Sequence, residues 1–345
     1  MVIAIIGAGL SGLVTAQRLM QAGHTVTVFE KSKGMGGRMS TRYAKGDRSS
    51  KFDHGTPFLS SQGPQFQAFI NDLEASGLVK KWTNKFLYED ADTITEVSAV
   101  PSGADLYVAS EGMNSIGKYL SRPIDVRNGV RVGGITHFGK KANKKKAWIL
   151  NLDDQQVFEA DAVIVALPAT QAYGVIQTAQ DETSIRRIIR EIDEISYDPS
   201  LSFMFNFGKQ EIPEWSALKL IDPNVSLIIN ESSKRDFSGD FTVVVHSTPE
   251  LALKHQSNDR DLALHEVLKV LVRELGSYAS NPQWHDIHFW RYARARKTIN
   301  SPFFECDDPD LPLAVIGDYF MGNDLEASYN SASALSDNWI QKYSI

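Results

Sequence analysis

Short apolar runs alternate with helical patterns from the first residues of the chain onward. Residues 2–6 form an apolar, β-branched run that predicts a strand, and residues 25–30 form a second one that ends in Glu30. Between them, apolar positions recur at the period of an α-helix. The segment therefore predicts one complete βαβ unit.

The middle of the chain continues this alternation. Residues 52–79 indicate a strand, a loop and an amphipathic helix, and a short helix is predicted to begin at Asn114 or Ser115. A small antiparallel meander follows, and then a continuous apolar run at 163–167, which is typical of a strand covered on both faces. Pro168 ends that strand.

The pattern changes between residues 190 and 290. Alternating strand-like segments there precede the helical pattern of residues 260–275, which together indicate a separate sheet with its own helix. The last segment returns to a buried strand followed by a long helix. No internal repeat is present.

Composition narrows the class of protein. The chain has 345 residues, which favours two domains, and a net charge of -6, which provides no basic field for nucleic acid. Cys306 is the single cysteine, so no intrachain disulfide can form. No apolar run approaches the roughly 18–20 residues of a membrane helix. We expect a cytoplasmic protein with no membrane span and no nucleic-acid partner.

One dense basic run, at residues 140–146, lies between two strand-like segments. A solvated hairpin turn is the favoured interpretation, with a polyanion site as the alternative.

The first predicted turn carries the chemistry of a dinucleotide site. Gly7, Gly9 and Gly12 have G-x-G-x-x-G spacing between the first strand and the first helix. The glycines permit a tight turn, close approach to a pyrophosphate and close packing of helix on sheet, while Glu30 would accept hydrogen bonds from a ribose. At this point both FAD and NAD fit.

A second glycine-rich stretch favours FAD. Residues 34–38 read Gly-Met-Gly-Gly-Arg, and Arg38 and Arg42 would supply cations close to phosphate. Asp318, after the last buried strand, can accept from ribityl or ribose hydroxyls. A longer cofactor needs these extra elements, so an NAD-dependent dehydrogenase is the weakest interpretation.

These motifs together resemble the FAD-dependent amine oxidase superfamily, and renalase-like proteins within it most closely. The resemblance rests on the two glycine motifs, the strand-Pro element at 160–172, the terminal "VIGDYF", and, in order, "GGRMSTR", "FDHG", "INESSK", "VVVHSTPE" and "FWRYARA". It implies an α/β fold with a glutathione-reductase-like Rossmann domain that binds FAD and an inserted sheet-plus-helix substrate domain. The expected boundaries are 1–60, 105–185 and 295–345 for the FAD-binding domain, and 61–104 and 186–294 for the substrate domain.

The predicted cofactor-binding residues come from the motifs and the resemblance together. They are Gly7, Gly9, Gly12, Glu30, Lys31, Gly36, Gly37, Arg38, Thr41, Gly55, Thr56, Val132, Gly317, Asp318, Glu326 and Ala327.

The sequence departs from the family pattern in two places. Thr56 and Pro57 stand where an Ala-Gln pair is common, and Ala327 stands where glycine is usual. Cys306 lacks the local pattern of a covalent flavin attachment, so FAD is expected to be bound noncovalently, and no metal site is predicted.

The resemblance implies a reaction. Some renalase-like proteins oxidise dihydronicotinamide isomers reduced at ring position 2 or 6: hydride passes to the flavin, and dioxygen is reduced to hydrogen peroxide. Two alternatives stay open, an amine oxidase of the same superfamily and a flavin-binding protein without turnover.

Four residues are predicted to contact the substrate: His246, Trp290, Tyr292 and Asn230. Each has a structural alternative. A strand histidine is often a satisfied structural residue, an aromatic strand face is more often core, and Asn230 can simply turn the chain. Period two on the predicted strand places His288, Trp290 and Tyr292 on one face and directs His285 to the other.

Overall fold

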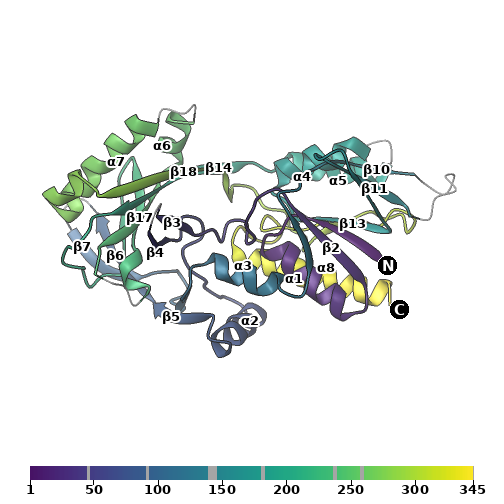
Figure 1. Ribbon diagram of the computed structural model, residues 1–345, viewed down its shortest axis with the longest axis horizontal. Coiled ribbons are helices and arrows are strands. Elements are labelled where there is room, and N and C mark those ends of the chain that lie inside the picture. The colour runs from purple at the N-terminus through teal and green to yellow at the C-terminus, as the bar shows by residue number, and fades with distance from the viewer. Residues whose placement is uncertain are drawn as a thin grey trace. The chain divides into compact units, whose positions relative to one another are not determined.

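The computed structural model describes residues 1–44, 47–90, 93–138, 146–179, 183–235, 239–256 and 260–344 (Figure 1). The chain divides into two compact units. The first unit comprises residues 1–37, 116–197 and 294–345, and the second comprises residues 38–115 and 198–293. The predicted boundaries give residues 38–60 and 105–115 to the FAD-binding domain, whereas both segments belong to the second unit. The assignment of functions to the two units stays a prediction.

A six-stranded sheet organises the first unit, in the order β19-β20-β13-β1-β2-β9. Its strands are β1 (Val2–Ile6), β2 (Thr25–Glu30), β9 (Asp125–Asn128), β13 (Ala162–Val165), β19 (Phe304–Glu305) and β20 (Leu313–Val315). β1 pairs in parallel with β13 and β2, and β13 with β20, while β19 is antiparallel. Helix α1 (Leu10–Gln21) connects β1 to β2, so the predicted βαβ unit and the α/β fold class are confirmed.

The remaining elements of the first unit include the predicted meander, short helix and long last helix, together with the helices α4 (Ala169–Ile176) and α5 (Thr183–Asp193), which the sequence pattern did not predict. β10 (Val132–His137), β11 (Trp148–Leu152) and β12 (Val157–Ala160) form the antiparallel meander. The two predicted helices are α3 (Asn114–Ser121), which begins in the second unit, and α8 (Leu325–Lys342). The basic run of residues 140–146, predicted to form a hairpin turn, lies outside the described residues except for Lys146.

The second unit contains a seven-stranded sheet in the order β18-β14-β17-β16-β15-β6-β7. The strands are β6 (Lys85–Asp90), β7 (Thr93–Ser98), β14 (Tyr197–Asn206), β15 (Ala217–Leu220), β16 (Val225–Asn230), β17 (Thr242–Ser247) and β18 (Trp284–Ala295). Alternate residues of β14 and β17 pack into different cores. Phe203 and Val245 pack with α7 (Arg260–Leu275), and Met204 and Val244 pack on the opposite face with Phe52.

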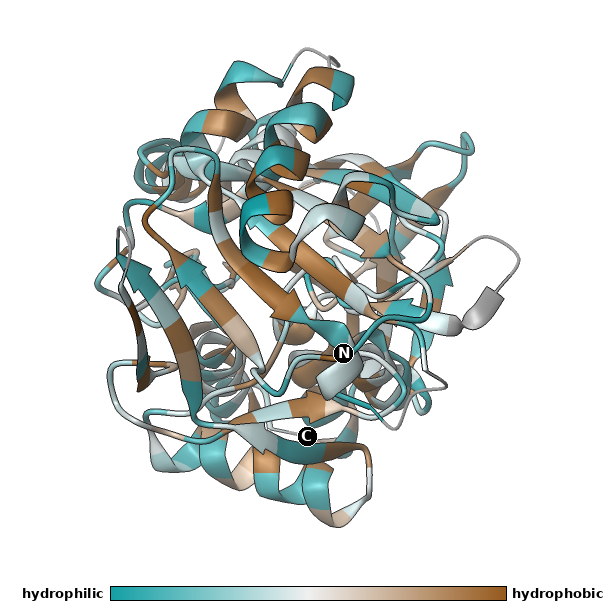
Figure 2. Ribbon diagram, turned by 90° about the vertical axis from the view of Figure 1, so that its left-hand side faces the viewer, coloured by the Kyte–Doolittle hydropathy of each residue, from teal (hydrophilic) through white to brown (hydrophobic). Residues whose placement is uncertain are grey.

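Smaller elements complete the second unit: α2 (Pro64–Ala75), α6 (Pro249–Lys254), and the strands β3 (Arg42–Ala44), β4 (Asp47–Phe52), β5 (Val79–Thr83) and β8 (Leu106–Ala109). α2 buries Phe66, Ile70 and Leu73, as its amphipathic pattern predicts. Several helices in Figure 2 alternate teal and brown along their length, which is the hydropathy pattern of helices with one buried face. Within the described residues, none of the helices is both long and apolar enough to cross a membrane.

Candidate functional site

The first glycine turn joins β1 to α1 in a geometry that only glycine permits. Gly7 has φ of 108°, and a Cβ on it would lie 2.4 Å from the carbonyl oxygen of Ala166. A Cβ on Gly12 would lie 2.0 Å from the carbonyl oxygen of Gly7, whereas one on Gly9 would have no neighbour within 4 Å. Helix α1 has no side-chain cap and no acidic residue in its first turn. Its positive end is therefore suited to an anion such as a pyrophosphate.

Glu30 ends β2 and is nearly buried. Its Oε2 accepts a hydrogen bond from the Ala8 amide at 3.0 Å, and its Oε1 accepts one from the Ser32 amide at 2.8 Å. Each carboxylate oxygen has two acceptor positions, so both can still accept from ribose hydroxyls. The neighbouring Lys31 donates to Gln171 Oε1 at 3.2 Å.

The second glycine stretch packs on the first through backbone contacts. The Gly36 amide donates to the Ala8 carbonyl at 2.8 Å, and a Cβ on Gly37 would lie 3.2 Å from the Cα of Gly9. Gly36 and Gly37 have φ of 108° and 56°. Residues predicted to meet one cofactor are thus brought together at the carboxyl ends of β1 and β2. The uncapped helix, the open space at Gly9 and the acceptor sites of Glu30 fit the nucleotide half of FAD.

Two further predicted residues follow β20. The Gly317 amide donates to Ser331 Oγ at 3.2 Å, and Asp318 is buried directly after it. Val132 lies at the start of β10, buried opposite Leu152.

The start of α8 carries the last two predicted cofactor residues. Asp324 caps the helix by accepting from the Ala327 amide at 2.8 Å, and Glu326 and Ala327 are both buried. A Cβ on Gly322 would lie 2.7 Å from the Cβ of Ala327. The alanine at this family position therefore packs tightly against the preceding turn.

In the second unit, the turn of residues 53–56, defined here as the Asp53 turn, is held by the backbone. The Thr56 amide donates to the Arg38 carbonyl at 2.8 Å, and the Gly55 amide to the Ser40 carbonyl at 3.4 Å. A Cβ on Gly55 would lie 1.9 Å from the Arg38 carbonyl oxygen, so this position requires glycine. Thr41 Oγ1 donates to Asp53 Oδ1 at 2.7 Å. Two backbone hydrogen bonds and one side-chain hydrogen bond thus join the turn to residues 38–41.

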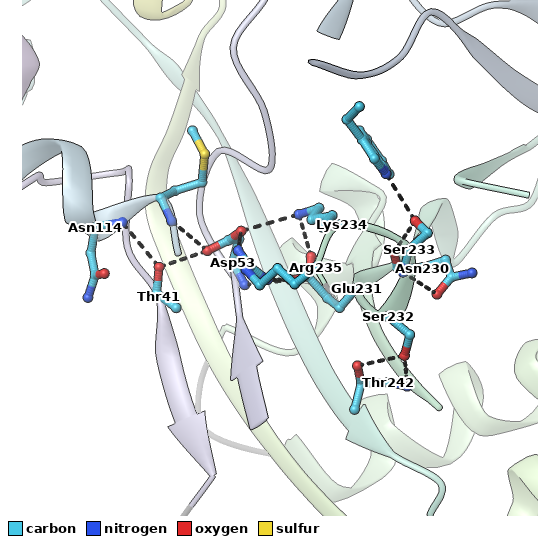
Figure 3. Close-up of polar contacts among 12 residues, drawn as sticks. Thr41, Asp53, Asn114, Asn230, Glu231, Ser232, Ser233, Lys234, Arg235 and Thr242 are labelled. Carbon is cyan, nitrogen blue, oxygen red and sulfur yellow. Dashed lines mark hydrogen bonds and ion pairs between the residues drawn. The ribbon is translucent and has the colours of Figure 1, made fainter. Parts of the chain in front are cut away.

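Asp53 belongs to four buried charged side chains, named here the buried ionic cluster: Asp53, Glu231, Lys234 and Arg235. Arg235 Nη1 lies 2.9 Å from Glu231 Oε2, and its Nη2 pairs with Asp53 Oδ2. Lys234 Nζ pairs with Glu231 and lies 3.4 Å from Asp53 Oδ2. Figure 3 shows Asp53 between Thr41 on one side and the two cations on the other. The formal charges sum to zero.

The cluster determines the protonation of Asp53. Burial alone would raise the pKa of its carboxyl, but the guanidinium of Arg235 and the ammonium of Lys234 hold that pKa below its ordinary value. Sequence reasoning missed this cluster. The only signal was the spacing of Glu231 to Lys234 and Arg235, which is also the spacing of an ordinary exposed ion pair.

Three aromatic rings gather behind the Asp53 turn. The His54 ring stacks on Trp290 with centroids 5.4 Å apart, and His288 meets His54 and Trp290 edge-on at 4.9 and 4.4 Å. Trp290 Nε1 donates to the His54 carbonyl at 2.8 Å. Burial lowers the pKa of His54 to about 3, and that of His288 to about 4. The structure therefore places the predicted substrate residue Trp290 against a neutral imidazole that sequence reasoning did not select.

His246 lies on β17, on the sheet face opposite α7. Its Nδ1 is 3.2 Å from Ser202 Oγ, and within the described part of the chain its buried Nε2 has no hydrogen-bond partner. Burial, followed by the nearby ammonium of Lys234, lowers its pKa to about 4. The ring is neutral at physiological pH.

We predict a pH-dependent stability from His246. An unfolded histidine has a pKa near 6.5. Between about pH 6.5 and 4, the unfolded chain therefore binds a proton that the folded chain does not, and the free energy of unfolding falls as pH falls. A His246→Gln variant, followed by urea unfolding across this window, should show a slope smaller by up to about 1.4 kcal/mol per pH unit. An unchanged slope would show that the ring titrates normally in the folded chain.

The predicted substrate residue Asn230 makes contacts of a structural kind. Asn230 is fully buried, and its Nδ2 donates to the carbonyls of Pro213 and Trp215, both at 3.0 Å. Its Oδ1 accepts from the Ser233 amide at 3.2 Å. This geometry favours the interpretation that Asn230 turns the chain.

The two predicted arginines belong to the second unit and make their contacts within it. Arg38 Nη1 donates to the carbonyls of Tyr292 and Ala293 at 3.4 and 3.3 Å, and Arg42 Nε lies 3.2 Å from Asp286 Oδ2. Their predicted phosphate contacts stay a prediction.

The two histidines of β18 take opposite faces of the strand, as period two predicts. His285 lies 6.4 Å from the ring of Phe205, which belongs to the core with α7, whereas His288 contacts His54. Over the ranges that the structure describes, no three His, Cys, Asp or Glu side chains are grouped to hold a metal ion.

Comparison with protein families decides the relationship. Residues 5–73 match the NAD(P)-binding Rossmann-like domain, and residues 86–308, more than half of the chain, match the family of flavin containing amine oxidoreductases. The chain belongs to the flavin-containing amine oxidoreductases. This amine oxidoreductase is therefore an FAD-dependent enzyme, as the second glycine-rich stretch and the family resemblance predict.

Solved structures agree on the fold. Putrescine oxidase with bound putrescine has a TM-score of 0.74 and 14% identity, with 99% of both chains covered. Cyclohexylamine oxidase from Brevibacterium oxydans IH-35A has a TM-score of 0.71 and 14% identity, with 99% of both chains covered. At this identity the likeness shows the fold alone.

Curated relatives match only a short segment. 4,4'-diapophytoene desaturases from Staphylococcus haemolyticus (strain JCSC1435) and Staphylococcus aureus (strain Newman) are 58% and 55% identical over 40 residues. Each match covers 12% of this amine oxidoreductase and 8% of the desaturase.

Proposed function

We propose that this amine oxidoreductase has renalase-like activity, with dihydronicotinamide dinucleotides reduced at ring position 2 or 6 as substrates. Noncovalently bound FAD would accept the hydride and pass the electrons to dioxygen, which becomes hydrogen peroxide. The protein's own task is then to bind and orient a planar ring and to keep water away from it.

The observation that carries this proposal is the packing of three rings, with His54 stacked on Trp290 and His288 edge-on to both, supported by the neutral state of the imidazoles. His54, His246 and His288 all have lowered pKa values and are uncharged at neutral pH. Oxidation of a dihydropyridine removes a hydride from a neutral ring and makes that ring aromatic. The step needs no side chain to accept a proton.

The carboxylates near these rings support the same substrate class. Asp53 and Glu231 pair with cations inside the buried ionic cluster, and Asp286 pairs with Arg42. A carboxylate already paired to a cation is a poor counter-charge for an ammonium substrate. These groups therefore favour an uncharged ring over a charged amine.

We assign the substrate contacts to Trp290, Tyr292 and His246. Trp290 stacks on His54 through one face, so its other face is the candidate platform for a planar ring. His246 Nε2 would supply a hydrogen bond to a polar substituent such as a carboxamide. Asn230, whose amide is engaged in the turn, has a positioning role in this assignment.

Amine oxidation is the second candidate, favoured by the family match over residues 86–308 and by the fold shared with putrescine oxidase. An amine must lose its proton before hydride removal. Imidazoles whose pKa values are lowered to about 3 and 4 are poor acceptors for that proton, so under this alternative we expect the amine to bind already deprotonated.

Oxygen consumption by the purified holoprotein separates the candidates. We expect catalase-sensitive oxygen uptake with 2- and 6-dihydro-NAD(P), and little with 4-dihydro-NAD(P)H, putrescine or cyclohexylamine. Oxygen uptake with amines alone would overturn the proposal and establish the second candidate. The absence of peroxide with every compound would favour a flavin-binding protein without turnover.

A further inference from the structure

We propose that the buried ionic cluster is a positioning device, in which Arg235 acts through Asp53 to fix the Asp53 turn and the His54–Trp290 stack. The inference rests on the proposed function for its kinetic consequence, because Trp290 is there the platform for the substrate ring.

The first argument is the free-energy cost of the cluster. Four charged side chains with at most 7% exposure lie together. Burying such charges costs about as much as their mutual attraction returns, so apolar side chains of similar volume could stabilise the fold equally well. The cluster is therefore better explained by the positions in which it holds its residues than by a contribution to the stability of the fold.

The second argument is what the cluster connects. Arg235 follows the 3-10 helix η2 (Glu231–Ser233), which begins directly after β16, while Asp53 follows β4. The guanidinium bridges the two carboxylates with separate nitrogen atoms. Glu231 Oε2 also accepts from the Asp53 amide at 3.2 Å. Asp53 is therefore bonded to η2 and the segment that follows it in two ways: its carboxylate pairs with Arg235, and its backbone amide donates to Glu231.

The third argument is the contact pattern of the following residue. The His54 amide donates to the Phe52 carbonyl at 3.0 Å, and the His54 carbonyl accepts from Trp290 Nε1. A displacement of Asp53 must therefore move the peptide groups that hold the His54 ring against Trp290. On the other side, the Met113 amide donates to Asp53 Oδ1 at 2.9 Å, which fixes Asp53 from the start of α3.

Arginine is chemically suited to this role. The planar guanidinium donates to two carboxylates from different nitrogen atoms in a fixed geometry. Lysine has a single ammonium nitrogen, which cannot be at its best distance from both carboxylates at once. Lys234 already occupies that single-point position between the same two carboxylates. An Arg235→Lys change keeps the charge of the cluster but removes the bridge.

Arg235→Lys is therefore the first test. We expect a denaturation midpoint near that of the wild type, a changed histidine NMR resonance for His54, and kcat/KM for the active dihydronicotinamide lowered about tenfold or more. The ring current of Trp290 makes the His54 resonance a reporter of the stack that does not depend on turnover. An unchanged His54 resonance together with unchanged kcat/KM would overturn the proposal.

A charge-balanced double variant separates positioning from stability. Asp53→Asn leaves the cluster with one excess positive charge, and Arg235→Met leaves one excess negative charge, but the double variant retains the neutral Glu231–Lys234 pair. We expect the double variant to regain most of the denaturation midpoint lost in each single variant, while the His54 resonance stays displaced. Full recovery of both would assign the cluster a purely structural role.

Lys254→Met is the matched control, because Lys254 pairs with Glu266 at the surface and contacts no residue of the cluster. It should leave the His54 resonance and kcat/KM unchanged. If the wild type oxidises no dihydronicotinamide, the proposed function fails, while the His54 resonance in Arg235→Lys still decides whether the cluster positions the turn.

Discussion

Replacement of Gly12 by alanine is expected to abolish FAD binding. The new Cβ would lie 2.0 Å from the carbonyl oxygen of Gly7, which is backbone and cannot move aside without opening the turn. Helix α1 would then be displaced from the sheet, and its first amides would no longer face the pyrophosphate. The flavin absorbance of the purified protein, and its recovery on reconstitution with FAD, measure the effect.

Gly9→Ala is the matched control for this prediction. A Cβ on Gly9 has no protein neighbour within 4 Å, so we expect the variant to fold as the wild type does. The methyl group should instead obstruct the cofactor and raise the Kd for FAD about tenfold or more, which corresponds to about 1.4 kcal/mol. A Gly12→Ala protein that retained stoichiometric flavin would contradict our account of the turn.

Lys234→Met is expected to lower the free energy of unfolding by about 3–5 kcal/mol. The Lys234 side chain is completely buried between Asp53 and Glu231, so its loss leaves an uncompensated negative charge in the interior. Chemical denaturation, followed by the fluorescence of the tryptophans, measures the change.

Lys254→Met also serves as the reference for stability. Its side chain is 61% exposed, and its ammonium pairs with Glu266 at 2.7 Å. A surface pair of this kind contributes about 0–1 kcal/mol. Equal effects of the two substitutions would mean that the cluster is solvated, and the positioning argument would lose its physical basis.

The fold was predictable where short-range patterns determine it. The βαβ unit follows from β-branched runs and helical periodicity within residues 2–30, and the close packing of Gly7 and Gly12 explains why glycine spacing is an informative signal. The fully buried strand β13 is readable from its continuous apolar run for the same reason.

The contacts of the second unit were not predictable, because they depend on residues far apart in the chain. Arg235 meets Asp53 across a separation of 182 residues, and Trp290 meets the His54 carbonyl across 236. The local sequence around Glu231 and Lys234 does not distinguish these buried side chains from charged side chains exposed to solvent. For Asn230 the sequence left a substrate contact and a chain turn as alternatives, and the hydrogen bonds of its side chain to two carbonyls and an amide favour the turn.

Anaerobic reduction of the bound flavin is the most direct test of the proposed function. Purified holoprotein would be mixed with 2- or 6-dihydro-NAD(P), with 4-dihydro-NAD(P)H, putrescine and cyclohexylamine as controls, and the flavin absorbance followed. We predict rapid bleaching by at least one dihydro isomer, no comparable bleaching by the controls, and peroxide formation when air is admitted. Bleaching by an amine, with none by either isomer, would contradict the proposed substrate class.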